Sequence, residues 1–83
     1  LNPTYAEAHF LRGIVRSSIG LQKEALLDCT NTIKINPKYG EAFYVRGIIK
    51  YALGDVNSGC YDLSRAGELG YSDSYGVIRD YCN

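Results

Sequence analysis

The sequence lacks the features that mark membrane proteins and nucleic-acid binders. Nine Lys and Arg face nine Asp and Glu among its 83 residues, so the chain has no basic excess for nucleic acid or an anionic membrane. No apolar run approaches the ~20 residues that a membrane span needs, and no signal-peptide pattern opens the chain. Because the chain begins without Met, the lack of a signal indicates nothing about compartment.

The residues that usually carry catalysis or bind metals are also scarce. His9 is the only histidine, and Cys29, Cys60 and Cys82 show no C-x-x-C spacing, so a metal site of the zinc type is not expected. Neither G-x-x-x-x-G-K-[ST] nor G-x-S-x-G occurs. We therefore expect no catalytic residue, no cofactor-binding residue and no metal ligand, and a protein that is not an enzyme.

What the sequence does contain is a repeat. The stretch INPKYGEAFYVRG at 35–47 is a near-copy of LNPTYAEAHFLRG at 1–13, at an offset of 34 residues. A fixed period of this length is typical of stacked helix–turn–helix units. Identical residues recur at this offset as Asn2 and Asn36, Pro3 and Pro37, Tyr5 and Tyr39, Glu7 and Glu41, Ala8 and Ala42, Arg12 and Arg46, Gly13 and Gly47, Ile14 and Ile48, Gly20 and Gly54, and Asp28 and Asp62.

Apolar residues spaced by three or four predict an all-α chain of about five helices. Turns are predicted at Gly20, Gly54 and Gly70, and Asn36-Pro37 should end the second helix because proline disfavours helical geometry before it. No alternating pattern of useful length predicts a strand. The predicted helices cover 6–18, 22–35, 40–52, 56–68 and 74–82. The predicted core consists of Ile14, Leu26, Cys29, Ile33, Phe43, Ile48, Leu63 and Leu69.

The period and the helix breaks together resemble the tetratricopeptide (TPR) family, whose pattern is W-x-x-L-G-x-x-Y, then A-x-x-x-F, then P. The glycines, Ala25 and Pro37 match that pattern by identity. The segment RAGELGYSDSYGVI also resembles the related Sel1-like repeats, but the strict period favours TPR. The pattern positions hold His9, Arg12, Gly13, Arg16, Ala25, Cys29 and Pro37 in the first repeat, and Phe43, Arg46, Gly47, Lys50, Gly59, Leu63 and Tyr71 in the second.

The resemblance implies a right-handed superhelix of helical hairpins. In this interpretation, 1–5 is the end of a preceding repeat, 6–39 and 40–73 are two repeats, and 74–83 is a C-terminal capping helix. Earlier repeats in a longer parent protein are part of this expectation. Each repeat in such a stack contacts its neighbours, so its outer units need polar outer faces.

Four repeated charges are predicted to be structural. Arg12 and Arg46 stand where the family has Leu, and Asp28 and Asp62 recur at the same offset, so an ion pair is expected either within each hairpin or from Asp28 to Arg46 across the junction. The alternative is two solvated arginines that contribute little. Gly13 and Gly47 should let paired helices approach closely.

Two cysteines are candidates for a disulfide. Cys60 lies in the second helix of the last repeat and Cys82 ends the helix that should pack beside it, whereas Cys29 falls at a core position. A bridge would indicate an oxidising compartment such as the periplasm or the cell exterior. The alternative is two free thiols in a cytoplasmic protein.

The family resemblance also implies a concave groove, lined by the first helices, that binds a peptide or a partner's helix. Positions 7, 10, 14 and 17, and again 41, 44, 48 and 51, share one helical face. Ile14 and Ile48 could instead belong to the core. No Lys and Asn clamp for a terminal carboxylate is present. The predicted groove residues are Glu7, Phe10, Ser17, Glu41, Tyr44, Ile48, Tyr51, Tyr75 and Ile78, with Ile14 and Arg79 beside them.

The expected partner is therefore a protein or peptide, with the chain acting as a scaffold or adaptor. The alternative is a structural element that stacks with further repeats or forms a homodimer through exposed repeat ends. RNA reading by related helical repeats is disfavoured by the neutral charge.

Overall fold

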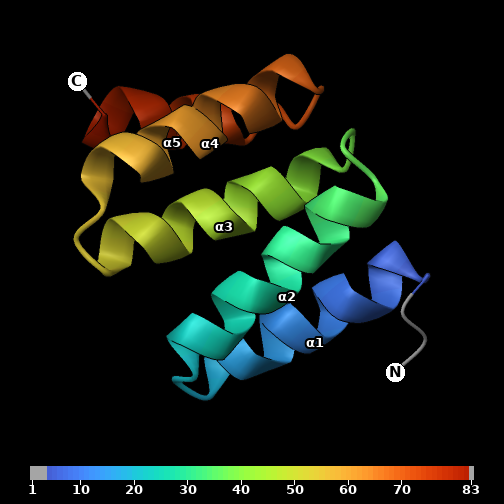
Figure 1. The fold of residues 1–83 in the computed structure, drawn as a ribbon. Coiled ribbons are helices and arrows are strands. Elements are labelled where there is room, and N and C mark those ends of the chain that lie inside the picture. Colours follow the sequence, from blue (N-terminus) through green and yellow to red (C-terminus); the bar gives the residue numbers. More distant parts are fainter. Residues whose placement is uncertain (1–3, 83) are drawn as a thin grey trace.

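The computed structural model describes residues 4–82 and shows five α-helices, with no strand in that range (Figure 1). The predicted all-α class is confirmed, and each predicted helix agrees within one residue at either end. The expected end of a preceding repeat falls partly on residues 1–3, outside this range. The helices are α1 (Ala6–Ser18), α2 (Gln22–Ile35), α3 (Gly40–Ala52), α4 (Val56–Glu68) and α5 (Ser74–Tyr81).

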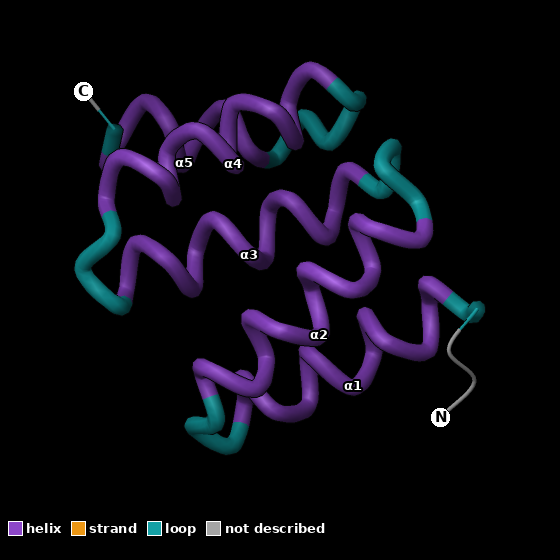
Figure 2. The backbone as a smooth tube through the Cα atoms, viewed as in Figure 1, coloured by secondary structure: helices purple, strands orange, loops and turns teal. Residues whose placement is uncertain are grey.

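The helices stack in chain order, with α1 and α5 at opposite ends of the stack (Figure 1). Helices α1 and α2 form one hairpin and α3 and α4 form another, joined by short loops (Figure 2). Helix α5 packs against α4. The stack measures 38 by 26 by 16 Å, so it is elongated, as expected when each unit contacts mainly its neighbours.

Three turns are built the same way. Gly20, Gly54 and Gly70 follow α1, α3 and α4 with φ angles of 89°, 95° and 100°, a left-handed conformation that glycine adopts without steric cost. In each turn the amide after the glycine donates to a carbonyl of the last helical turn, as Leu21 does to Arg16 at 2.8 Å. This bonding satisfies carbonyls that the ending helix leaves free.

Small residues let the helices of each hairpin approach closely. A Cβ added to Gly47 would lie 2.7 Å from the Gly59 carbonyl oxygen, which is closer than real contacts allow. In the first hairpin Ala25 occupies the position of Gly59, and a Cβ added to Gly13 would lie 3.1 Å from the Cβ of Asp28. The second hairpin is therefore the tighter of the two.

The core differs from the predicted one most in α1 and α3, and the predicted core residues Leu26, Ile33 and Leu69 are only half-buried. Of the two assignments given for Ile14 and Ile48, core or groove, the core assignment is wrong: they are 38% and 39% exposed. The neighbouring residues Phe10 and Ile49 are buried instead, at 4% and 2%. Ile49 faces α2, whereas Ile48 turns one position around α3 toward the open side of the stack.

Cys29 lies at the centre of the junction between the hairpins. It is fully buried and packs with Ala25 and Ile49, and Leu26 and Val45 cover the cluster. Burial, reinforced by the charge of Asp28, raises the pKa of the Cys29 thiol to about 11. The thiol therefore stays neutral at physiological pH and acts as a small apolar side chain.

Candidate peptide-binding groove

Two buried aspartates fix the orientation of the first helix in each hairpin. Asp28 of α2 accepts hydrogen bonds from Arg12 at 2.7 Å and from Arg16 at 3.3 Å. Its side chain is fully buried, so the arginines supply the partners that a buried carboxylate requires. Of the two predicted arrangements, the pairing within the hairpin is the one that forms.

The second hairpin repeats this arrangement. Asp62 of α4 accepts from Arg46 Nε at 2.8 Å and Nη2 at 3.0 Å, and Lys50 lies 3.1 Å away. Arg46 also reaches Thr30 of α2 at 3.4 Å. These bonds turn the cations of α1 and α3 toward their hairpin partners, and the faces that carry Glu7 and Glu41 are left for other contacts.

An apolar pocket opens where α3, α4 and α5 meet. Its volume is about 280 Å³. Two of its lining residues, Tyr51 and Tyr81, pack edge to face with their ring centroids 5.8 Å apart. The lining residues are Ile48, Tyr51, Ala52, Leu63, Val77 and Tyr81.

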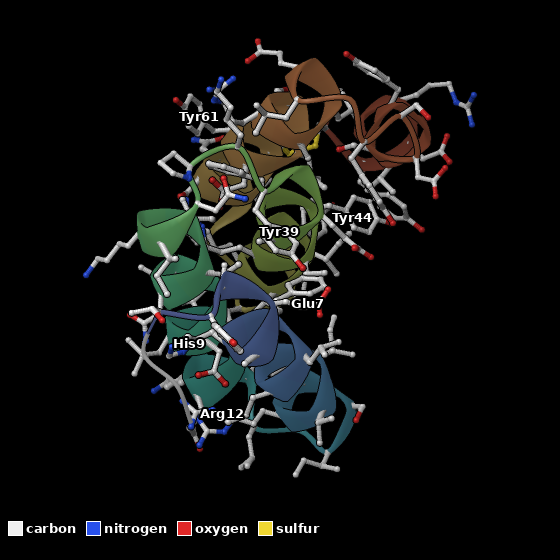
Figure 3. All side chains as sticks on the ribbon, turned by 90° about the vertical axis from the view of Figure 1, so that its right-hand side faces the viewer. Glu7, His9, Arg12, Tyr39, Tyr44 and Tyr61 are labelled. Carbon is white, nitrogen blue, oxygen red and sulfur yellow. A yellow bond between two sulfur atoms is a disulfide. The ribbon has the colours of Figure 1, made fainter. Side chains whose placement is uncertain are left out.

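Tyrosines and carboxylates gather at the other end of the same side of the stack. The rings of Tyr44 and Tyr71 lie 4.9 Å apart, and Tyr39 packs on Phe10 at 5.1 Å. Figure 3 shows Glu7 and Tyr44 on the side toward α5, whereas His9 and Tyr61 lie on the opposite side. We call this tyrosine-rich end and the apolar pocket together the groove.

Two tyrosines at this end, Tyr39 and Tyr71, have a raised pKa, in part because carboxylates lie nearby. Burial is the main cause that raises the pKa of Tyr39, and the charges of Glu7 and Glu41 raise it further. Burial is also the main cause that raises the pKa of Tyr71, and the charges of Glu41 and Asp73 raise it further. Carboxylates disfavour the ionised phenolate, so both rings remain neutral donors in the physiological range.

The structure brings some of the predicted groove residues together and separates others. Ile48 and Tyr51 line the pocket, and Tyr44 lies above it in the tyrosine cluster. Phe10 is buried beneath Tyr39, and the Ser17 hydroxyl lies 3.0 Å from the Gln22 side-chain oxygen of α2. These last two positions support the groove rather than forming its surface.

Helix α5 presents a different face from the predicted one. Tyr75 lies over Gly67 of α4, where an added Cβ would meet its ring at 2.7 Å, and Ile78 is half-buried. The α5 residues in the pocket are Val77 and Tyr81. At the 34-residue offset Ile78 and Cys82 correspond to Tyr44 and Ile48, so the α5 residues that line the pocket lie one position before the expected ones.

A disulfide joins α5 to the rest of the stack. Cys60 and Cys82 are bonded, with their Cα atoms 5.8 Å apart. At the other end of α5, the buried Ser74 hydroxyl donates to the carbonyl oxygen of Leu63. Helix α5 has only eight residues and would be marginal alone, so these two attachments hold Val77 and Tyr81 at the pocket.

A comparison with models of known protein families finds no match to this chain, and a comparison with curated proteins finds none either. No helix within residues 4–82 combines the length and apolar character that crossing a membrane requires. The same residues contain no group of three or more side chains suited to hold a metal ion.

Proposed function

We propose that the chain is a non-catalytic protein–protein interaction module of the TPR type, which binds a peptide or partner helix in the groove. The observation that carries this proposal is the apolar pocket, which three helices surround and no side chain fills. A pocket of about 280 Å³ is large enough for one aliphatic or aromatic side chain, which is how peptide-binding sites commonly anchor a ligand.

The chemistry of the lining supports the same role. Tyr51 and Tyr81 offer apolar area with a polar tip, and such residues dominate binding energy at interfaces. Tyr81 is 59% exposed, and Ile48, a large aliphatic residue, is 39% exposed. Burying this surface against a partner would be favourable by ~25 cal/mol per Å² of apolar area.

Selection from a random peptide library tests this proposal. Peptides selected on the unmodified chain should lose most of their affinity for the double variant Tyr51→Ala/Tyr81→Ala. The matched control is Tyr61→Ala, because Tyr61 is 67% exposed on the opposite side of the stack. Equal binding to both variants would show that the groove is not the binding site.

A second candidate function is self-assembly through the outer face of α1. Leu11 and Val15 are 55% and 57% exposed there, whereas Ile49, which follows Val15 by 34 residues, is buried against α2 at 2%. Light scattering on the chain distinguishes the two functions. A dimer that Val15→Glu dissociates, and that Leu27→Glu on α2 does not, would favour assembly.

The disulfide favours an oxidising compartment, such as the periplasm or the cell exterior, as the place where this module acts. Thiol titration of protein isolated with its redox state trapped should then find one free thiol per chain, that of Cys29. Three free thiols would instead favour the cytoplasm.

A further inference from the structure

The charges of α1 and α3 are divided between the two sides of each helix. All four of their cationic side chains, two arginines in α1 and Arg46 and Lys50 in α3, are held by the buried Asp28 and Asp62. The acidic residues of these two helices, Glu7 and Glu41, are exposed and form no ion pair with any residue in the described range. The first helices therefore contribute negative charge to the groove.

The neutral total hides this asymmetry. Two aspartates bind four of the nine cations, so five cations and seven anions lie elsewhere in the chain. Of those cations, Lys23 and Lys34 lie on α2 and Arg65 lies on α4, the second helix of each hairpin. Arg79 of α5 is paired with the adjacent Asp80 at 3.0 Å. Arg65 is paired with Glu68 on α4 at 3.3 Å, so apart from the buried aspartates α2 alone of the second helices has more cations than anions.

The tyrosine-rich end combines this charge with aromatic rings. Carboxylates attract a cationic side chain, and neutral phenol rings add cation–π attraction. Glu41 lies at the start of α3, between Tyr39 and Tyr44 in the sequence, and each of these tyrosines belongs to one of the two ring pairs. Lys and Arg are the side chains whose charge complements such a surface.

We infer that the groove selects a peptide with Lys or Arg at the tyrosine-rich end and an apolar side chain in the pocket. Ten residues of α3 separate Glu41 from Tyr51, a distance of about 15 Å at 1.5 Å per residue. An extended peptide covers that distance in about four or five residues. This inference rests on the proposed function, because it specifies what the proposed groove binds.

Three fluorescein-labelled synthetic peptides test the inference by fluorescence anisotropy. Each carries one Leu, and two positions four and five residues before it hold Lys, Gln or Glu. The Lys peptide is expected to bind about fivefold more tightly than the Gln peptide, because two exposed charge contacts contribute less than about 1 kcal/mol each. The Glu peptide should bind most weakly. Raising salt from about 50 to about 200 mM should reduce the differences.

Variants separate charge selection from binding itself. The double variant Glu7→Gln/Glu41→Gln should bind the Lys and Gln peptides with equal affinity. Glu24→Gln is the matched control, because Glu24 also lies in the first turn of a helix, α2, and shares any effect on the helix dipole. The Glu24→Gln variant should still bind the Lys peptide more tightly than the Gln peptide.

The outcomes are distinguishable. If all three peptides bind with equal affinity, or if the Glu peptide binds best, the groove binds peptides without selecting basic ones and the inference is overturned. If the double variant Glu7→Gln/Glu41→Gln still prefers the Lys peptide, other residues recognise the peptide's lysines and the inference also fails. If none of the peptides binds and library selection yields no groove-dependent ligand, the proposed function itself fails.

Discussion

The two hairpins follow one plan but lie in different surroundings. Each has a buried aspartate that binds two cations, and each has a glycine where its helices cross. The second hairpin is covered by α2 on one side and α5 on the other, so Ile49 is buried, whereas Val15 at the same position of the first hairpin is exposed. The residues repeated in both hairpins thus determine how each hairpin forms, and the neighbouring helices determine which of its residues are buried.

The two junctions between units differ even more. The junction of α2 with α3 is an apolar cluster around Cys29 and Ile49, with Leu26 packed against it. At the junction of α4 with α5, Cys60 occupies the position equivalent to Leu26 and is bonded to Cys82. A covalent bond therefore replaces apolar packing where the last helix is too short to bury much surface.

The largest expected effect is the loss of a buried carboxylate, and it should be greater in the second hairpin. Asp62→Asn leaves Arg46 and Lys50, which are only 16% and 19% exposed, without their anion. We expect the free energy of unfolding to fall by about 4 kcal/mol. Asp28→Asn should cost about half as much, because Arg12 is 38% exposed and water can solvate it.

Urea denaturation followed by circular dichroism measures both changes on the same scale. The comparison depends on the difference in exposure between the two sites. Equal losses in the two variants, or a greater loss for Asp28→Asn, would show that exposure of the cation does not decide the cost.

Reduction of the disulfide should have the next largest effect, confined to the α4 and α5 junction. The bond joins residues 22 apart in sequence, and opening such a loop is expected to cost about 3 kcal/mol. Helix α5 should then loosen, and the pocket would lose Val77 and Tyr81. Hydrogen exchange with and without reductant measures this: amides of α5 should exchange faster, while those at the α2 and α3 junction should change little.

Cysteine alkylation supplies the control for this experiment. In the reduced, folded chain Cys60 and Cys82 should react at pH 8, whereas Cys29 should not, because burial raises the pKa of its thiol to about 11. Unchanged protection of α5 after both cysteines have reacted would mean that packing alone holds the helix.

Substituting the crossing glycines should produce a smaller effect that differs in the same direction. Gly47→Ala places a methyl group 2.7 Å from the Gly59 carbonyl oxygen, and moving the helices apart should cost about 2 kcal/mol. Gly13→Ala meets the Cβ of Asp28 at 3.1 Å, and the gain in helix propensity of about 1 kcal/mol should offset much of the strain. Thermal melting of the two variants tests this comparison. A midpoint for Gly13→Ala below that of Gly47→Ala would contradict it.

The helices could be predicted from the sequence because their signals are local. Gly20, Gly54 and Gly70 mark the turns, and Asn36-Pro37 ends α2. The faces of the helices were harder to predict, because a shift of one residue rotates a helix by about 100°.

Two positions illustrate this difficulty. Whether Ile48 or Ile49 is buried depends on where α2 packs, and the use of Val77 and Tyr81 rather than Ile78 in the pocket depends on how α5 packs against α4. The ion pairs were predictable as pairs, since Arg12 and Asp28 recur together with Arg46 and Asp62, but their register required the packed hairpins.

The smallest expected effect is a gain in stability that would make the first hairpin more like the second. His9 is only 9% exposed, and its ring nitrogens have no hydrogen-bond partner among the described residues. Phe43, at the equivalent position, is an apolar ring beside the guanidinium groups of Arg46 and Arg65. Replacing the unpaired imidazole by His9→Phe should stabilise the fold by about 1 kcal/mol, because a buried polar group without a partner is costly.

The space beside His9 allows this change. A hollow of about 290 Å³, lined by His9, Asn31, Lys34 and Ile35, adjoins the ring and can accommodate the larger phenyl group. The thermal midpoint should rise by about 5 °C for a domain of this size. The reverse substitution, Phe43→His, should lower the midpoint by at least as much, because it buries an imidazole in the tighter hairpin. A midpoint for His9→Phe at or below that of the unmodified chain would show that the imidazole is satisfied in solution.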